Sequence, residues 1–470
     1  MKLHEWTIAR ARMALVKGDV SCVEYVTALL VQGRRKAALN ALIARDDDAL
    51  LAAAQGLDNS GAARDPDMLL AGIPIALKDN INTGALTTSA GTGALRGRVP
   101  PANAPVAQRL FDAGALLGGK ANMHELAFGI TNNNPVTGAT RNPWSPRMIP
   151  GGSSGGSAAA VGARTVPAAI GTDTGASVRL PAALCGVVGL RPTVGRYPGK
   201  GIVPISHTRD TPGPIARSVE DIALLDHILA AEKTTSAPGA VELRNLRLGV
   251  PRRHFYDGAD TGVLALVEAA LERLRQAGVG LIEAEVDSLA ALNRAASLPI
   301  VHYELMQDLP AYLRECGYDL TMGDIAAGAE TPEVAELLQS QLGGHAISQA
   351  AYEEAMQARV RLRAAYAGYF SQHRVEAMLF PTSILPARPI GQDVMVELNG
   401  RQVPTFNTYI RNTDPGSTAG IPGISIPIGL TADRLPVGLE LDGPDHSDRH
   451  LIAIAAALEK ILPPMPLPPE

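Results

Sequence analysis

Three short segments of this chain carry residues whose types and order could perform nucleophilic chemistry. They are Lys-Asp-Asn at 78–80, Gly-Gly-Ser-Ser-Gly-Gly-Ser at 151–157 and Gly-Thr-Asp-Thr-Gly-Ala-Ser at 171–177. A serine hydroxyl is a poor nucleophile until a neighbouring base takes its proton, and no positioned histidine and carboxylate pair is evident in these segments. A lysine can supply that base only when its amine is neutral.

The residues before Lys78 bear on whether its amine could be neutral. Residues 70–77, LAGIPIAL, form a short apolar run that predicts a buried strand ending at Lys78. Burial at the end of such a strand would desolvate the ammonium group and lower its pKa. Taken alone, Lys78 could also be an ordinary surface lysine at a strand end.

The two serine-containing segments also have ordinary explanations when each is taken alone. Residues 150–160 could be a flexible turn or a phosphate cradle at a helix N-terminus, but they match neither G-x-x-x-x-G-K-[ST] nor G-x-G-x-x-G. Residues 171–177 could be a glycine-rich bend. Because residues 150–193 are rich in Gly, Ser, Ala and Thr and carry few charges, they predict close approach of backbone segments. A nucleotide-binding module is a remote alternative.

Alternating strand and helix patterns surround these segments. We expect a helix over 19–30 with Ser21 and Glu24 in capping-box spacing, and a helix followed by a short strand over 105–121. A long helix is expected over 347–372, strands over 421–430 and 436–441, and a closing helix over 447–462. The pattern predicts an α/β protein with a mixed β-sheet.

The amino-acid composition and net charge limit the classes of molecule that the protein is expected to bind. With 470 residues, 46% hydrophobic residues and a net charge of −5, the chain predicts a compact protein without the basic surface that nucleic acid or an anionic membrane would need. Cys22, Cys185 and Cys316 are widely spaced, so a disulfide framework is not expected. No signal peptide or membrane span is recognised. We expect a cytoplasmic protein that acts on a small molecule, needs no cofactor and forms a homodimer.

In combination, the three segments resemble the amidase-signature family. The resemblance continues through residues 179–193 and 206–225 and covers the segments leading into the first serine loop, with the weakest similarity from about 240 to 345. It implies an amidase-signature fold, in which helices flank both faces of a central mixed sheet. It also implies a single amidase domain over 1–470, with a variable substrate-specificity region at about 235–380.

The resemblance implies a role for each of the three residues. Ser177 corresponds to the nucleophile, Ser153 to the residue that relays the proton, and Lys78 to the base. Ser153 precedes Ser177 by 24 positions, and the family holds the relay serine by a cis peptide bond, which we expect between Gly152 and Ser153.

Acyl transfer also needs donors for the developing oxyanion. The backbone N–H groups of Thr174, Gly175, Ala176 and Ser177 are the expected donors, because they adjoin the nucleophile in a tight turn. The family usually has glycine where this chain has Ala176, so a positive φ at that position would strain the loop. Arg179 and Asp210 are expected to support the site by hydrogen bonds rather than to perform chemistry.

The carboxy-terminal segments 407–429 and 435–459 resemble the branch of the family that releases ammonia from arylacetamide-type primary amides. The expected pocket residues are Phe128, Gly129, Ile130, Thr131, Trp144, Tyr197, His302, Tyr303 and Phe406. An ordinary core role is at least as plausible for most of the aromatic ones. Ten histidines lack metal-binding spacing, so no metal site is expected.

Two other functions remain open at this point. One keeps the same residues but cleaves an anilide, a carbamate or a urea-type C–N bond. The other is a catalytically silent binding protein of the same fold, which Ala176 would favour.

Overall fold

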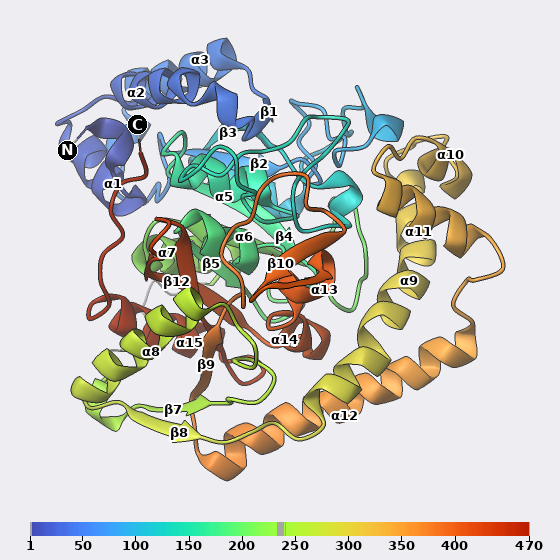
Figure 1. Cartoon of the computed structure of the whole chain (residues 1–470). Coiled ribbons are helices and arrows are strands. Elements are labelled where there is room, and N and C mark those ends of the chain that lie inside the picture. The colour runs from blue at the N-terminus through green and yellow to red at the C-terminus, as the bar shows by residue number, and fades with distance from the viewer. Residues whose placement is uncertain (1, 233–238, 240, 470) are drawn as a thin grey trace.

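A mixed sheet of eleven strands forms the centre of the computed structural model, which describes residues 2–232, 239 and 241–469 (Figure 1). Its order is β1-β3-β2-β4-β6-β5-β12-β13-β9-β7-β8. The strands are β1 (Leu42–Ala44), β2 (Pro74–Lys78), β3 (Leu116–Ala121), β4 (Ala168–Asp173), β5 (Val188–Arg191), β6 (Thr211–Ala216), β7 (Arg247–Val250), β8 (Gly280–Glu283), β9 (Ala377–Pro381), β12 (Gly423–Leu430) and β13 (Pro436–Asp442). A separate hairpin pairs β10 (Met395–Leu398) with β11 (Arg401–Pro404).

Strand directions divide the sheet into regions. Strand β2 is parallel to both β3 and β4, and β7 is parallel to β8 and β9. The pairs from β4 through β6, β5, β12 and β13 to β9 are antiparallel. The sheet is therefore mixed, as the sequence pattern predicts, and it joins strands from both halves of the chain.

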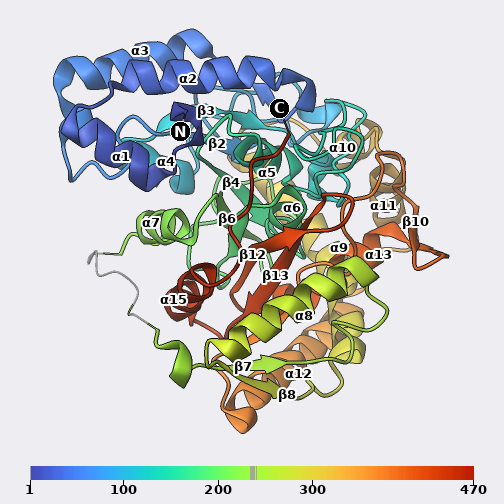
Figure 2. The ribbon, with the colours of Figure 1, turned by 60° about the vertical axis from the view of Figure 1, so that its left-hand side comes forward.

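Helices cover both faces of this sheet (Figures 1 and 2). In β4, Ala168 and Ile170 belong to a large apolar cluster that includes residues of α7 and α15, whereas Ala169 packs with residues of α5 and α6. This alternation is what a strand buried on both faces requires. These four helices are α5 (Gly155–Gly162), α6 (Arg179–Cys185), α7 (Val219–Leu229) and α15 (Asp448–Glu459).

The remaining helices lie around this centre. They are α1 (Ile8–Lys17), α2 (Cys22–Arg35), α3 (Asp47–Ser60), α4 (Pro105–Asp112), α8 (Thr261–Gln276), α9 (Leu289–Glu315), α10 (Met322–Ala327), α11 (Pro332–Leu342), α12 (Gln349–His373), α13 (Thr405–Ile410) and α14 (Asp414–Ala419). None of the helices in the described ranges combines the length and hydrophobicity that a membrane span needs.

Most of the expected elements are present. The capping box at the start of α2 forms as expected: Ser21 Oγ accepts from Glu24 N at 3.1 Å, and Glu24 Oε2 accepts from Ser21 N at 2.8 Å. The apolar run before Lys78 is strand β2, and the long helix expected over 347–372 is α12. The central mixed sheet with helices on both faces agrees with the architecture that the resemblance implies.

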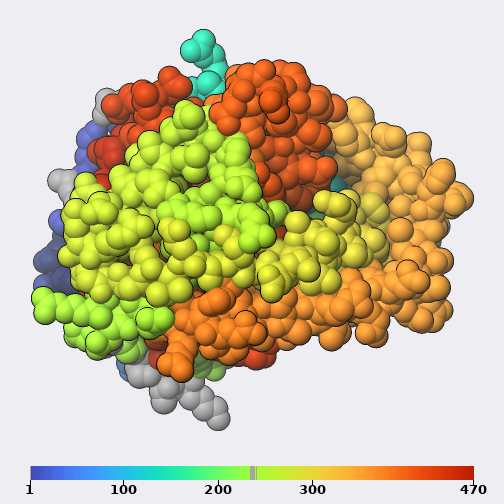
Figure 3. Space-filling view, turned by 60° about the horizontal axis from the view of Figure 1, so that its bottom comes forward, coloured from blue at the N-terminus to red at the C-terminus, as the bar shows by residue number. Residues whose placement is uncertain are grey.

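Helix α9 has no counterpart among the expected elements. It spans 27 residues and contains Pro299 and Pro310. It packs along α12, and with α10 and α11 it encloses a second apolar cluster around Val301 and Leu305. Figure 3 shows that the second half of the chain, coloured yellow-green to orange, forms most of this face of the molecule.

Helices α9, α10 and α11 lie within the region 235–380 that the sequence marks as variable. Residues 233–238 and 240, which overlap its start, lie outside the described residues. The division into one domain with a variable specificity region stays a prediction.

Candidate active site

Lys78 is the last residue of β2, and its side chain is fully buried. Side chains two residues apart on a strand lie on the same face, so Lys78 shares a face of β2 with Ala76, which packs with residues of α5. Lys78 Nζ lies 2.7 Å from Ser153 Oγ and 2.8 Å from Thr172 Oγ1. Asn80 Nδ2 also donates to Thr172 Oγ1, at 3.0 Å. The lysine amine is therefore held between two hydroxyl groups.

Burial changes the acidity of this amine. Removal from water lowers the pKa of Lys78 to about 7, although the negative charges of Asp173 and Asp210 oppose the change. The expected desolvation of Lys78 by the preceding apolar strand is therefore present. Near neutral pH a large fraction of the amine is uncharged and able to accept a proton.

Ser153 lies in the loop that leads into α5. The Gly152–Ser153 peptide bond is cis, as expected, and Ser153 O accepts a hydrogen bond from His124 N at 3.2 Å. Close backbone packing holds this loop: a Cβ added at Gly156 would lie only 2.4 Å from Asn122 N. The small residues predicted to allow close backbone approach therefore have that role here.

Ser177 follows β4 through a short loop and precedes α6. Its carbonyl oxygen accepts a hydrogen bond from Ser154 N at 3.1 Å, so the two serine loops are joined directly through their backbones. Among the described residues, no acceptor pairs with the N–H groups of 174–177. Ala176 is buried and is not one of the non-glycine residues with positive φ, so its methyl group does not strain the loop.

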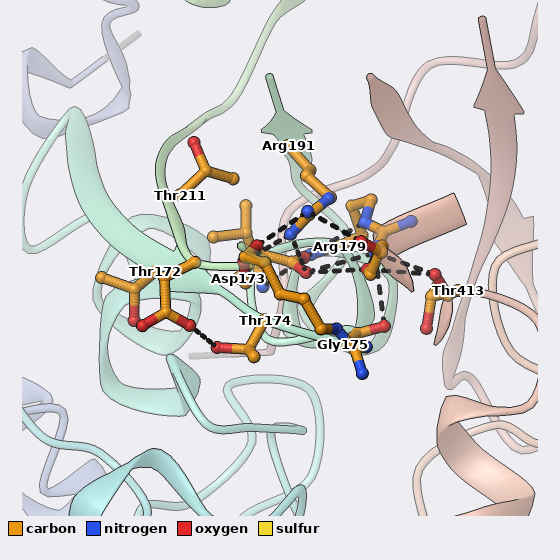
Figure 4. Close-up of polar contacts among 12 residues, drawn as sticks. Thr172, Asp173, Thr174, Gly175, Arg179, Arg191, Thr211 and Thr413 are labelled. Carbon is orange, nitrogen blue, oxygen red and sulfur yellow. Dashed lines mark hydrogen bonds and ion pairs between the residues drawn. The ribbon is translucent and has the colours of Figure 1, made fainter. Parts of the chain in front are cut away.

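Arg179 holds the loop 173–177 in place through hydrogen bonds to Asp173 and Gly175. Its guanidinium group donates to Asp173 through Nε at 3.1 Å and through Nη2 at 3.2 Å, and to Gly175 O at 3.3 Å. Figure 4 shows Arg179 and Arg191 converging on Asp173. Arg191 Nη1 lies 3.2 Å from Asp173 Oδ1. Two buried cations therefore hold the carboxylate at the end of β4 and hold the pKa of Asp173 well below its usual range.

Asp210 holds the same loop from another direction. Thr174 Oγ1 donates to Asp210 Oδ1 at 2.6 Å, and the backbone N–H groups of Ile205 and Ser206 donate to Asp210 Oδ2 at 2.7 and 3.0 Å. Burial raises the pKa of Asp210, although these three hydrogen bonds oppose the change. Arg179 and Asp210 thus make the kind of hydrogen bonds expected of supporting residues.

A cavity of about 250 Å³ opens at the 174–177 loop. Its volume is just below the range of about 300–1,000 Å³ that is common for small-molecule sites. Predicted pocket residues that line it are Phe128, Gly129, Ile130, His302 and Phe406, together with all four residues of the loop. The lining is mainly apolar, so the cavity is suited to a small, uncharged group.

Comparison with known proteins places the chain in one family. The amidase family model matches residues 24–452. The chain belongs to the amidase family. It is 49% identical to indoleacetamide hydrolase of Rhizobium radiobacter over 97% of each chain. It is 39% identical to mandelamide hydrolase of Pseudomonas putida, over 99% of this chain and 93% of that protein.

The solved structures give the same result. The crystal structure of peptide amidase from Stenotrophomonas maltophilia superposes on this amidase with a TM-score of 0.85, at 30% sequence identity and over 99% and 98% of the two chains. The protein is therefore an amide-hydrolysing enzyme.

Four predicted pocket residues of the amidase do not line this cavity. Trp144 is buried and donates its indole N–H to Cys185 O at 2.9 Å, and Tyr197 donates its hydroxyl to Asp226 at 2.5 Å. Tyr303 stacks on Tyr352 with ring centroids 4.2 Å apart. Thr131 is buried beside the cavity residues without lining it. The aromatic side chains have core or surface partners instead, which is the ordinary use of such residues.

Several lining residues of the amidase were missed by the sequence analysis. They are Ala127, Ile205, Arg209, Ser297, Leu298, Val301, Glu333, Leu337, Ile410 and Asp414. Leu298, Val301 and His302 follow helical i, i+3, i+4 spacing, a signal that could have placed them on one face of a helix. Arg209 and Asp414 form a buried ion pair at 2.5 Å, and no sequence pattern links positions so far apart.

Among the described residues of the amidase, one group of possible metal ligands lies together: His207, Glu304 and Asp308. Protein donors already occupy its carboxylates. Glu304 accepts from Thr208 N at 3.2 Å, and Asp308 accepts from His207 N at 2.8 Å. We assign no metal to this group.

Proposed function

We propose that the protein hydrolyses a small aryl-substituted primary carboxamide to its carboxylic acid and ammonia through a seryl acyl-enzyme. Ser177 is the nucleophile, Ser153 relays protons and Lys78 is the base. The observation that carries the proposal is the 2.7 Å contact between the buried Lys78 Nζ and Ser153 Oγ, at a loop hydrogen-bonded to Ser177. An amine of lowered pKa in this position can accept a proton near neutral pH.

In the first step, Ser177 Oγ forms a bond to the amide carbon, and the carbonyl electron pair moves onto the oxygen. The Ser177 proton passes to Ser153, whose own proton passes to Lys78. The N–H groups of 174–177, which have no acceptor among the described residues, are the proposed donors to the oxyanion, and losing one such donor typically costs about 3–4 kcal/mol of transition-state stabilisation.

In the second step, the C–N bond breaks and ammonia leaves with the proton that returns from Lys78 through Ser153. Water then attacks the acyl ester under the same base, releases the carboxylic acid and restores the Ser177 hydroxyl. No group outside the protein and water is needed to balance either step.

The cavity favours an uncharged aryl group on the acyl side. Phe128, Ile130, Leu298, Val301 and Phe406 give it apolar walls. Of its charged lining residues, Arg209 and Asp414 neutralise each other in a buried ion pair, and Glu333 is exposed to solvent. Relatives named indoleacetamide hydrolase and mandelamide hydrolase support the same class of acyl group.

Two experiments test this proposal. Purified enzyme is given indole-3-acetamide, phenylacetamide, mandelamide, an anilide and an aryl carbamate, with detection of ammonia and aniline. Faster cleavage of the anilide or carbamate than of the primary amides would replace the proposed substrate class. A fluorophosphonate probe should label the wild type and not Ser177→Ala, and labelling that persists in the variant would remove Ser177 as the nucleophile.

The cellular setting completes the proposal. We propose a cytoplasmic enzyme, because Cys22, Cys185 and Cys316 are all free thiols. The expected homodimer stays a prediction, and light scattering coupled to size-exclusion chromatography measures it directly.

A further inference from the structure

Behind the 173–177 loop, three buried carboxyl groups surround two buried guanidinium groups. Asp173 is bound by Arg179 at 3.1 Å and by Arg191 at 3.2 Å. Arg179 Nη1 also lies 3.0 Å from Glu440 Oε1 and 3.8 Å from Asp442 Oδ1. If all five groups were ionised, the cluster would carry one uncompensated negative charge, which is costly for fully buried groups.

Asp442 is the least satisfied member of this cluster. Its side chain is fully buried, and among the described residues neither of its oxygens has a hydrogen-bond partner. It lies close to Glu440: the position of a Cβ added at Gly423 would be 2.5 Å from Asp442 Oδ1 and 2.9 Å from Glu440 Oε1. Glycine at 423 therefore leaves the two carboxyl groups adjacent, with no side chain between them.

No further cation balances this charge in the described part of the chain. Strands β9 and β12, which flank β13, contain no charged residue. Tyr366 of α12 faces the cluster, and burial together with the charge of Asp442 keeps its phenol neutral by raising its pKa. Other charged groups on helices near β13 have partners of their own: Asp414 with Arg209, Asp448 with Thr193, and Glu268 with Arg252.

We propose that Glu440 and Asp442 share one proton at neutral pH, and that this protonated pair positions Arg179 and, through it, the loop that carries Ser177. The claim that the pair positions the loop rests on the proposed function, because only that function gives the loop a part in the reaction. The chain of contacts is short. Glu440 accepts from Arg179 at 3.0 Å, and Arg179 donates to Gly175 O at 3.3 Å and to Thr413 O at 3.1 Å.

The pair should give the protein a characteristic pH dependence. Burial raises the pKa of Glu440 to about 7, helped by the charge of Asp173 and opposed by Arg179. Burial and the neighbouring charge of Glu440 raise the pKa of Asp442 well above its usual range. A carboxyl group whose pKa is raised by folding stabilises the folded state most at low pH. That stability is lost as pH rises from the unfolded pKa of about 4 towards the folded value, because the folded protein retains a proton that the unfolded chain releases.

The first experiment tests the proton without reference to activity. Thermal unfolding is measured at pH 5, 6, 7 and 8 for Ser177→Ala, Ser177→Ala with Asp442→Asn, and Ser177→Ala with Asp433→Asn as an exposed control. The Asp442→Asn substitution leaves two cations facing two anions, so the melting temperature of that variant should rise relative to the parent at each higher pH. A constant difference across pH overturns the shared proton. The shared proton is also overturned if the melting temperature of Ser177→Ala changes when sodium or potassium chloride replaces choline chloride. A bound metal cation, rather than a proton, would then balance the negative charge of the cluster.

The second experiment tests positioning in the otherwise native enzyme. Asp442→Ala should lower kcat about tenfold or more with little change in KM, and Asp442→Asn should recover most of that loss. The alkaline limb of the wild-type pH profile should move to higher pH by at least about one unit in Asp442→Asn. Equal kcat in the Ala and Asn variants, or an unmoved alkaline limb, overturns the positioning role. Failure of the proposed function is separate, because it would appear as activity retained by Ser177→Ala.

Discussion

The pH dependence of turnover should follow the charge of Lys78. Free lysine has a pKa of 10.5, so at pH 7 only about one amine in three thousand is neutral. Burial lowers the pKa to about 7, so about half of the amines are neutral at that pH. The apolar surroundings of β2 therefore raise the population of the neutral amine by about three orders of magnitude.

The corresponding measurement is kcat/KM for indole-3-acetamide by ammonia release from pH 5 to 9 at constant ionic strength. A base must be unprotonated to act, so kcat/KM should fall on the acid side of its maximum, by about tenfold for each pH unit well below 7. Thermal unfolding of the wild type at each pH shows whether the enzyme remains folded throughout.

Lys78→Arg and Lys78→Met are the matched variants. Arginine stays protonated at every pH tested, so Lys78→Arg should lose at least about a hundredfold in kcat/KM with no recovery at pH 9. Lys78→Met should unfold at a higher temperature than the wild type below about pH 7, because the buried ammonium is gone. A wild-type profile that stays flat from pH 5 to 9, or a Lys78→Arg enzyme with a tenth of native activity, would refute the neutral-lysine mechanism.

Four further substitutions test other parts of the site. Ser153→Ala should lower kcat about a thousandfold with a near-native melting temperature, and an active variant would exclude the relay. Thr174→Val removes the 2.6 Å bond to Asp210 and should cost about 1–3 kcal/mol of stability, measured by urea unfolding, together with a lower kcat. Leu298→Trp should raise KM for indole-3-acetamide about tenfold relative to acetamide, and unchanged selectivity would argue against this cavity as the acyl site. Ala176→Gly should lose about 1 kcal/mol of stability on urea unfolding without a gain in kcat, and faster turnover would show that the methyl group hinders the reaction.

Local patterns in the sequence predicted the parts of the fold and site that local interactions determine. The apolar run before Lys78 indicated a buried strand because only burial accounts for such a run, and strand β2 is present there. Ser21 and Glu24 predicted the start of α2 because both capping partners lie within one turn. The composition of the serine loops indicated close backbone approach, and Gly156 has that role.

Contacts between distant parts of the chain could not be predicted in the same way. Helix α9 contains Pro299 and Pro310, which normally argue against a helix interior, and tertiary packing on α12 overrides that preference. Trp144 and Tyr197 were predicted as pocket walls because aromatic residues suit both a pocket and a core. Their choice of core partners depends on the three-dimensional arrangement.

The helices that supply much of the cavity wall come from a different stretch of sequence than Lys78, Ser153 and Ser177. Leu298 and Leu337 lie on α9 and α11, which belong to none of the strands and loops that carry those three residues. Under the proposed function, exchanges on these two helices would therefore change the range of accepted acyl groups without altering Lys78, Ser153 or Ser177. Directed evolution toward new amides should therefore begin at these positions.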